Sequence, residues 1–372
     1  MDFLYKKVGD YQYDPKSTLL GKGIFGEVYL GEHSDDPNIK VAIKVVSSSV
    51  LEANKEHLKL FLREVEVLKG IKGKHVLELK DAIQTASGNL YLVTNYCNGG
   101  NLEMLLYKEK KISVEVALKY LYQITEAFEE LANLDIKDIF GRKMTIMHRD
   151  IKPSNILLHN GEIVIADFGF AKFTVENEKG IKRDHTKLGT PLYMAPQILA
   201  RADYSYKCDV WSTAVVIYEL IFGKKPWEGA SIHKLLDNIR NQPLKFPAPI
   251  PQEVEDLLSK MLVYDDRNRF SWKEVSAHPA FELLKKNKNI DIDNLAKKDD
   301  TQNLIKKEGS KNSPAKIGRI EILSQEPTTK EAIDAEQKKQ AQADQIKLNV
   351  QPTQEQNDKA NRKSKIKFIE DS

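Results

Sequence analysis

The chain has 372 residues, enough for two compact units and a tail, because single domains typically run about 100 to 200 residues. Its 57 basic residues nearly balance 54 acidic ones, and the net charge of +3 argues against a dedicated nucleic-acid binder. Cys97 and Cys208 lie far apart, and there is neither an apolar leader nor an apolar run of about 18 residues. This excludes a disulfide framework and a membrane span, and predicts a soluble, cytoplasmic protein.

After an N-terminal extension at 1–10, residues 11–97 contain three runs rich in β-branched residues, LGKGIFGEVYLGEH, VAIKVVS and NLYLVTNYC. Such runs are typical of strands. One helical pattern, from about Leu51 to Lys69, interrupts them. Its apolar residues recur every three or four positions and predict one face against the sheet: Leu58, Phe61, Leu62, Val65 and Leu68.

A glycine-containing turn joins the first two strand-like stretches. Its glycines let the backbone approach phosphate oxygens, and its last residue would cover a base. The turn comprises Gly21, Lys22, Gly23, Ile24, Phe25, Gly26, Glu27 and Val28. A dinucleotide-binding fingerprint would need a helix directly after the third glycine, whereas EVYLGEH continues as strand.

Lys44 lies on the next predicted strand, where it could contact the α- and β-phosphates of ATP if a carboxylate fixes it. The predicted helix offers Glu64 as that carboxylate, with Glu66 as the competitor. Taken alone, a lysine such as Lys44 is more often a solvated strand lysine; the glycine turn upstream favours the contact with ATP.

The pattern changes at the Asn98-Gly99-Gly100 turn, and 98–284 read as a second, mostly helical unit. Within it, HRDIKPSN (148–155) precedes ADFG (166–169). Asp150 could orient an attacking hydroxyl, and Lys152 could neutralise charge on the transferring phosphoryl group. Asn155 and Asp167 could chelate a hard divalent cation, for which Mg²⁺ is favoured and Mn²⁺ is an alternative.

Together these motifs resemble the eukaryotic protein kinase family over about 19–281. The resemblance implies an α+β, two-lobed protein kinase fold: a small β-rich N-lobe with one regulatory helix and a larger, mainly α C-lobe. Lys152 and the Gly189-Thr190-Pro191 run are similar to the serine/threonine branch. The stretches 96–102, ADFGFAK and PLYMAP look most like autophagy-initiating ULK-type kinases.

The resemblance also assigns roles to single positions. Thr94 would guard the back of the ATP pocket, and further nucleotide contacts would come from Ala42, Asn95, Cys97, Asn101 and Leu157. His148 and Phe168 would belong to a hydrophobic spine, and Asp209 would be the buried aspartate that holds the catalytic loop.

Three departures from the family pattern stand out. Asn95 replaces an acidic residue that is common beside the hinge between the lobes, and we expect this change to be tolerated. Gln197 replaces a usual glutamate, and we expect it to bind Arg269 through a weaker, uncharged hydrogen bond. The connection at 132–147 is longer than usual, which favours a lengthened surface loop over a partner site.

Regulation is predicted on the activation segment. Arg149 precedes the catalytic aspartate, so a phosphate on Thr186 could pair with it and order the segment; Thr174 is the second candidate, and Thr190 lies in the same region.

The tail at 285–372 is poor in aromatic residues and is predicted to be largely disordered, with a regulatory protein as a candidate partner. Its basic residues Arg362, Lys363, Lys365 and Lys367 form only a weak case for membrane contact.

The sequence therefore predicts a Mg-ATP-dependent serine/threonine protein kinase acting on protein substrates, with autophagy initiation as a candidate pathway. The alternatives are a catalytically weak pseudokinase-type scaffold and a small-molecule kinase of similar fold.

Overall fold

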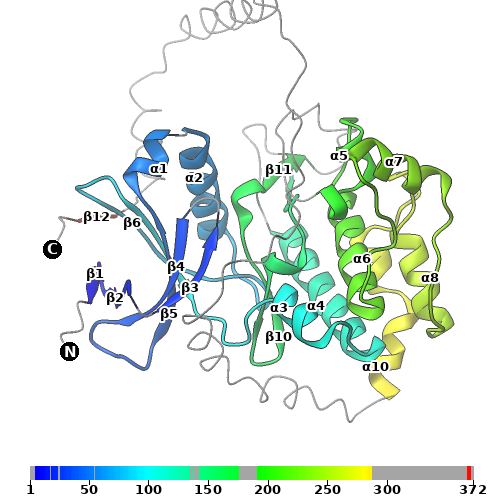
Figure 1. Cartoon of the computed structure of the whole chain (residues 1–372), viewed down its shortest axis with the longest axis horizontal. Coiled ribbons are helices and arrows are strands. Elements are labelled where there is room, and N and C mark those ends of the chain that lie inside the picture. Colours follow the sequence, from blue (N-terminus) through cyan, green and yellow to red (C-terminus); the bar gives the residue numbers. More distant parts are fainter. Residues whose placement is uncertain are drawn as a thin grey trace, which may run out of the picture. The chain divides into compact units, whose positions relative to one another are not determined.

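A computed structural model describes residues 5–16, 18–23, 26–53, 55–134, 136, 142–175, 191–286 and 367–369. These residues form a β-rich N-lobe followed by a helical C-lobe, which confirms the predicted α+β, two-lobed architecture (Figure 1). No helix of the described ranges is both long and apolar enough to cross a membrane.

The N-lobe strands form one sheet in the order β1-β2-β4-β5-β7-β6-β12, with β3 paired to β4. All pairings are antiparallel except that of β12 with β6. The strands are β1 (Lys6–Val8), β2 (Tyr11–Tyr13), β3 (Leu19–Gly23), β4 (Gly26–His33), β5 (Lys40–Val46), β6 (Leu79–Thr85), β7 (Leu90–Asn95) and β12 (Lys367–Ile369). Four of these, β1, β2, β6 and β12, lie outside the runs that the sequence identified as strands.

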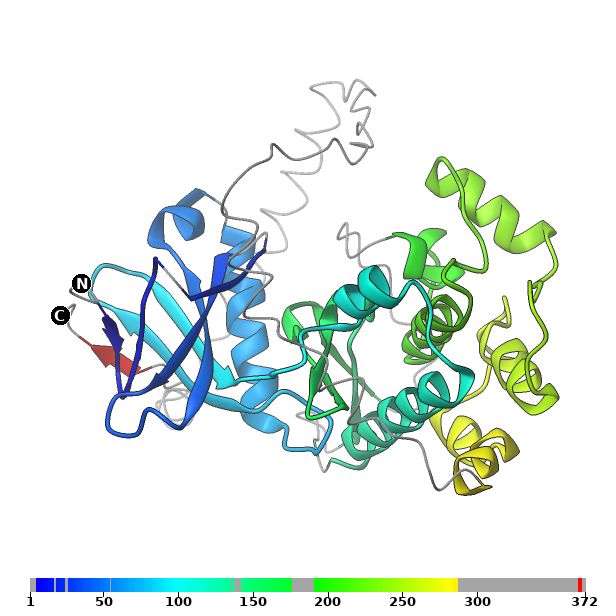
Figure 2. The ribbon, with the colours of Figure 1, turned by 60° about the horizontal axis from the view of Figure 1, so that its bottom comes forward.

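Alternation along the strands separates the two faces of this sheet. On β7, Tyr91 and Val93 pack in a cluster with Val8 of β1, so the β1–β2 hairpin covers one face. Leu90 and Leu92 pack in the main core with Phe61 of α2, which covers the other face. Figure 2 shows α2 on the side of the sheet that faces the C-lobe.

The predicted helix is two helices, α1 (Ser48–Ala53) and α2 (Lys55–Gly70). The predicted apolar face is wrong at two positions, because Leu58 and Leu62 are exposed. The buried stripe instead contains Phe61, Glu64, Val65, Val67 and Leu68. Residues 58 and 62 are spaced four positions apart, as expected for one helix face, but they lie just outside the part of the helix surface that packs on the sheet. Glu64 lies within that part.

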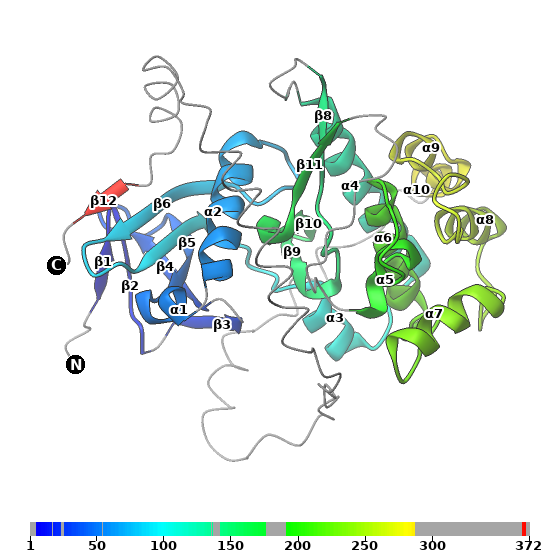
Figure 3. The same ribbon diagram turned by 90° about the horizontal axis from the view of Figure 1, so that it is seen from above.

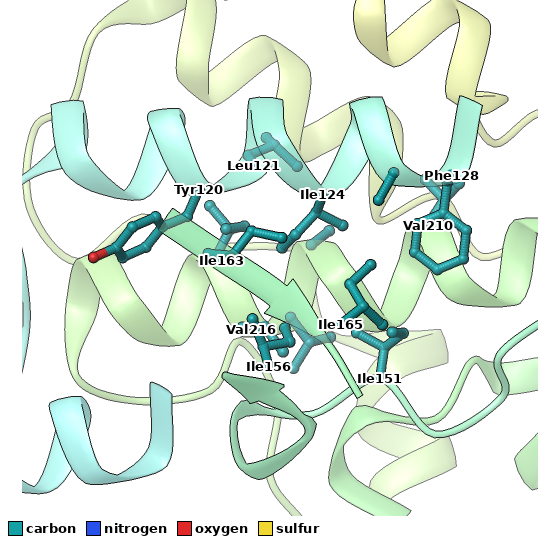
Figure 4. Packing of buried hydrophobic residues seen from close by; sticks show 14 of the residues in the cluster. Tyr120, Leu121, Ile124, Phe128, Ile151, Ile156, Ile163, Ile165, Val210 and Val216 are labelled. Carbon is teal, nitrogen blue, oxygen red and sulfur yellow. The ribbon is translucent and has the colours of Figure 1, made fainter. Parts of the chain in front are cut away.

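The C-lobe, which the sequence predicts to be mostly helical, is built on two long helices, α4 (Val114–Asn133) and α6 (Lys207–Phe222). Figure 4 shows Ile124 and Phe128 of α4 on the side of the helix that faces β10 and α6, and both belong to the main core cluster. The remaining helices are α3 (Leu102–Glu109), α5 (Pro196–Leu199), α7 (Ile232–Asn241), α8 (Gln252–Met261), α9 (Trp272–Ser276) and α10 (Glu282–Lys286).

One short hairpin and one pair of strands that are not consecutive in the chain carry the site residues between the lobes. β9 (Ile156–His159) pairs with β10 (Glu162–Ile165), and β8 (Met144–Met147) pairs with β11 (Lys172–Val175). Figure 3 shows β9 and β10 between the N-lobe sheet and the C-lobe helices. The predicted boundary turn meets β9 directly, because the Gly99 N–H donates to the Leu158 carbonyl oxygen at 2.8 Å. A Cβ at Gly99 would lie 2.8 Å from that of Leu158, so this approach requires glycine.

Candidate active site

A buried ion pair connects the N-lobe sheet to α2. Lys44 lies on β5, and its Nζ is 2.6 Å from the Oε2 atom of Glu64. Glu64 is buried, whereas its competitor Glu66 on the same helix is exposed. The structure therefore selects Glu64 as the carboxylate that fixes Lys44.

Charge and burial act against each other in this pair. Burial would lower the pKa of Lys44, but the carboxylates of Glu64 and Asp167 outweigh it and raise that pKa overall. Burial, together with Asp167, raises the pKa of Glu64 against the opposing effect of Lys44. The 2.6 Å contact thus joins a lysine whose pKa is raised by its acidic neighbours to a carboxylate that is buried beside it.

The catalytic loop follows β8 and ends in the 3-10 turn η1 (Pro153–Asn155). The carboxylate of Asp150 accepts from Lys152 Nζ at 2.8 Å and from Asn155 Nδ2 at 2.9 Å, both at its Oδ2 atom. The Asn155 amide nitrogen also donates to the Asp150 carbonyl oxygen at 2.9 Å. The three predicted residues are thus brought together, with the carboxylate held in one orientation.

Asp209, at the start of α6, anchors the backbone of this loop through hydrogen bonds, as predicted. Its two carboxylate oxygens accept the backbone N–H groups of His148 and Arg149, each at 2.8 Å. These bonds stabilise Arg149 at a φ of 68°, a left-handed conformation that is costly for a residue with a side chain. Burial raises the pKa of Asp209, against the lowering effect of His148 and the two N–H groups. The predicted spine contact is also present, because the rings of His148 and Phe168 are 4.8 Å apart.

Asp167 is placed to receive a cation. Its backbone is left-handed, with φ 64° and ψ 68°, and its Oδ1 atom is buried without a hydrogen-bond partner. The next residue back, Ala166, donates its N–H to the Asn155 carbonyl oxygen at 2.9 Å, so the two candidate metal ligands are connected through the backbone. Because the Asn155 amide nitrogen is used by Asp150, its amide oxygen is the atom left for a metal. A carboxylate oxygen and an amide oxygen are ligands that suit Mg²⁺.

A small pocket adjoins these groups. It is lined by Lys44, Glu64, Asp167, Gly169, Leu60 and Phe61. Leu60 and Phe61 were not among the residues predicted for the site. Their spacing was the available signal, because residues three and four positions before Glu64 share its side of the helix.

The glycine turn is partly described. Gly23 pairs with Gly26, and Lys22 forms an exposed ion pair with Glu27 at 2.8 Å; Gly21 pairs with Val28. A Cβ at Gly26 would lie 2.0 Å from the Val45 carbonyl oxygen, so only glycine fits there. Ile24 and Phe25 lie outside the described residues.

Several residues predicted to contact nucleotide lie at the end of β7 or after it. Thr94 is buried and lies opposite Ala42 of β5, and the Asn95 side-chain oxygen accepts the Glu78 N–H at 2.9 Å. Cys97 and Leu157 pack against the same small cluster, which contains Leu77, Val164 and Ala166. Burial raises the pKa of the Cys97 thiol to about 12. Asn101 caps α3 by accepting the Met104 N–H at 2.9 Å, so its side-chain oxygen has a structural role beside its predicted contact with nucleotide.

The regulatory predictions are described only in part. Thr186 and Thr190 lie outside the described residues. Arg149 donates from Nε to the Phe170 carbonyl oxygen at 2.7 Å and from Nη1 to the Tyr204 hydroxyl at 3.1 Å. Thr174 lies on β11, opposite Thr145 of β8.

Gln197, which departs from the family pattern, contacts Arg269 as predicted. Arg269 is almost fully buried and donates from Nη2 to the Gln197 side-chain oxygen at 3.0 Å. The Gln197 amide nitrogen donates in turn to the Tyr264 carbonyl oxygen. Burial lowers the pKa of Arg269 to about 10, although Cys208, Asp266 and Asp265 act to raise it.

Fold and site together define a two-lobed kinase, and comparison with known proteins agrees. A model of the protein kinase domain matches residues 15–281. Mouse serine/threonine-protein kinase ULK3 is 34% identical over 71% of this chain and 54% of its own length. The Dictyostelium discoideum serine/threonine-protein kinase atg1 is 32% identical over 73% of the chain and 39% of its own length. Mouse Aurora kinase C is 33% identical over 70% of this chain and 88% of its own length.

The chain belongs to the protein kinase family. The predicted resemblance to ULK-type kinases is confirmed by the ULK3 and atg1 matches. The chain spans about half the length of ULK3 and less of atg1.

Proposed function

We propose that this chain is an active, Mg-ATP-dependent serine/threonine protein kinase that transfers the γ-phosphate of ATP to protein hydroxyl groups. The observation that carries the proposal is the assembled catalytic loop. Asp150, Lys152 and Asn155 are joined by hydrogen bonds of 2.8 to 2.9 Å, and Lys44 is fixed by Glu64 at 2.6 Å.

The residues have separate parts in the proposed reaction. Lys44, fixed by Glu64, contacts the α- and β-phosphates of ATP, and the glycine turn covers them. The free Oδ1 edge of Asp150 orients the hydroxyl of the substrate protein and accepts its proton, while Lys152 neutralises charge on the transferring group. Asp167 and Asn155 hold Mg²⁺, which when bound would neutralise charge on the phosphate oxygens.

A pseudokinase-type scaffold remains the competing function. A weakened link at Gln197 would favour a scaffold, but the Gln197 side-chain oxygen still accepts a hydrogen bond from Arg269. No other described departure in the catalytic set supports a scaffold. The similarity to ULK3 and atg1 supports autophagy initiation as the proposed pathway. We also propose that the chain acts in the cytoplasm.

We further propose that phosphate on Thr186 pairs with Arg149 and orders the activation segment. The guanidinium already bridges Phe170 and Tyr204, which places it beside the start of that segment. The test is activity of Thr186→Ala and Thr174→Ala chains; unchanged rates after full dephosphorylation of the wild-type chain would contradict the proposal.

Phosphate transfer from radiolabelled ATP to a generic protein substrate, followed by analysis of the labelled amino acids, tests the proposed activity. We expect label on serine and threonine and none on tyrosine. Asp167→Asn should lose the Mg²⁺-dependent part of nucleotide binding while still folding. Binding of nucleotide without any transfer by the wild-type chain would support the scaffold instead.

A further inference from the structure

The last described strand of the chain lies on an edge of the N-lobe sheet. β12 runs parallel to β6, with Lys367 opposite Ile83, Phe368 opposite Gln84 and Ile369 opposite Thr85 (Figures 1 and 3). On its other side β6 pairs with β7. β12 therefore occupies the edge at which the path of strands would otherwise end.

An open strand edge presents unpaired N–H and C=O groups and is a template for another extended segment. The half of β6 that β12 meets is firmly embedded, because Ala82, Ile83 and Thr85 are all buried. Ile83 packs with Val8 of the β1–β2 hairpin on one face of the sheet, while Ala82 packs with the main core on the other. The edge is thus a rigid template that is held from both faces.

This edge is connected to the active site through packed elements. β6 packs against α2, and Ala82 belongs to the same core cluster as Phe61 and Val65 of that helix. Phe61 lines the pocket beside Glu64, whose carboxylate holds Lys44. A strand that rigidifies β6 therefore acts on the element that carries Glu64.

We propose that Lys367–Ile369 is a docking strand that binds the β6 edge of its own chain and stabilises α2. The occupant is this segment because the structure seats it there, and the tether 287–366 spans up to about 3.3 Å per residue when extended. Tethering makes the binding step intramolecular and raises the effective concentration of the strand. Docking itself is independent of the proposed function, whereas its effect on nucleotide binding rests on that function.

Hydrogen exchange of the full-length chain tests the docking. Phe368→Pro removes one N–H and disfavours strand pairing of the preceding residue, and deletion of 367–372 removes the strand altogether. The matched control is Gln356→Pro, which places the same residue in the tether. We expect amide exchange at Ala82–Thr85 to rise about threefold to tenfold in the deletion chain, as for loss of one or two backbone hydrogen bonds, and to stay unchanged in the control.

Equal exchange in the deletion chain and the wild type would overturn the proposal. Protection that grows with protein concentration would also overturn it, because the strand would then come from a second copy. In the deletion chain, the KM for ATP in phosphate transfer should be about threefold higher than in the wild type, an effect typical of coupling through packed elements. If amide exchange is faster but the KM for ATP is unchanged, the proposed action on α2 is overturned and the docking is not. If the wild-type chain shows no transfer activity, the proposed function is refuted, and the exchange measurement still tests the docking.

Discussion

Replacing Glu64 with glutamine should weaken the protein in two measurable ways. Removing one partner of a buried ion pair typically costs about 3–5 kcal/mol. Here the cost should be smaller, about 2 kcal/mol, because the Lys44 side chain keeps 19% of its exposure and Asp167 is a second nearby carboxylate. In a domain of this size that corresponds to a fall in Tm of about 4–8 °C.

The second effect concerns nucleotide. Without Glu64, the lysine is drawn toward Asp167, whose unpartnered Oδ1 is the proposed cation ligand. We therefore expect the KM for ATP to rise by about tenfold or more, together with a weaker Mg²⁺ dependence, since loss of a charge-assisted contact costs about 1.5 kcal/mol or more.

Thermal unfolding and ATP kinetics of Glu64→Gln measure these effects, with Glu66→Gln as the matched control. Glu66 makes the same charge change on the same helix, but it is exposed, so its variant should stay within about 0.5 kcal/mol of wild type. Equal losses in both variants would mean that the helix charge matters and the pair with Lys44 does not, which would refute the reasoning.

Three further predictions concern the supports of the site. Asp209→Asn leaves one acceptor for two N–H groups, so unfolding free energy should fall by about 2 kcal/mol and transfer should slow; full activity in this variant would show that Arg149 holds its φ without the anchor. Gln197→Ala should cost about 1.5–3 kcal/mol in urea unfolding because buried Arg269 loses an acceptor, whereas Gln197→Glu should change stability little, since its charge is offset by the lost donation to Tyr264. Burial raises the pKa of the Cys97 thiol to about 12, so this thiol is protonated at pH 8. Iodoacetamide should therefore label Cys97 at least about a hundredfold more slowly in the folded chain than in the unfolded chain, and the labelling rate should increase as pH rises. Labelling at the rate of the unfolded chain would contradict this burial.

The catalytic set was predictable because its residues are close in sequence. Asp150, Lys152 and Asn155 lie within one loop, so their spacing alone brings them together, and Asp167 follows after a single hairpin. The pairing of Gln197 with Arg269 was predictable only through the family resemblance, because these residues are far apart in the chain.

The sheet edges and the helix face were harder to predict. β6 carries Lys80 and Asp81, which weaken its strand signal, and β12 depends on a parallel pairing with a strand remote in sequence. On α2, positions 58 and 62 and positions 61, 65 and 68 have the same helical spacing. Only the position of the sheet shows which stripe is buried.

The most direct test of the proposed catalysis is the rate of phosphate transfer by the wild-type chain and by Asp150→Asn, with ATP affinity measured in both. Asparagine keeps the size of the side chain and the acceptor for Lys152 but cannot take the proton of the substrate hydroxyl. We predict that transfer falls by about 10² to 10⁴ while ATP binding is kept. Equal transfer by both chains would contradict the assignment of Asp150, and no transfer by either would contradict the proposed kinase activity.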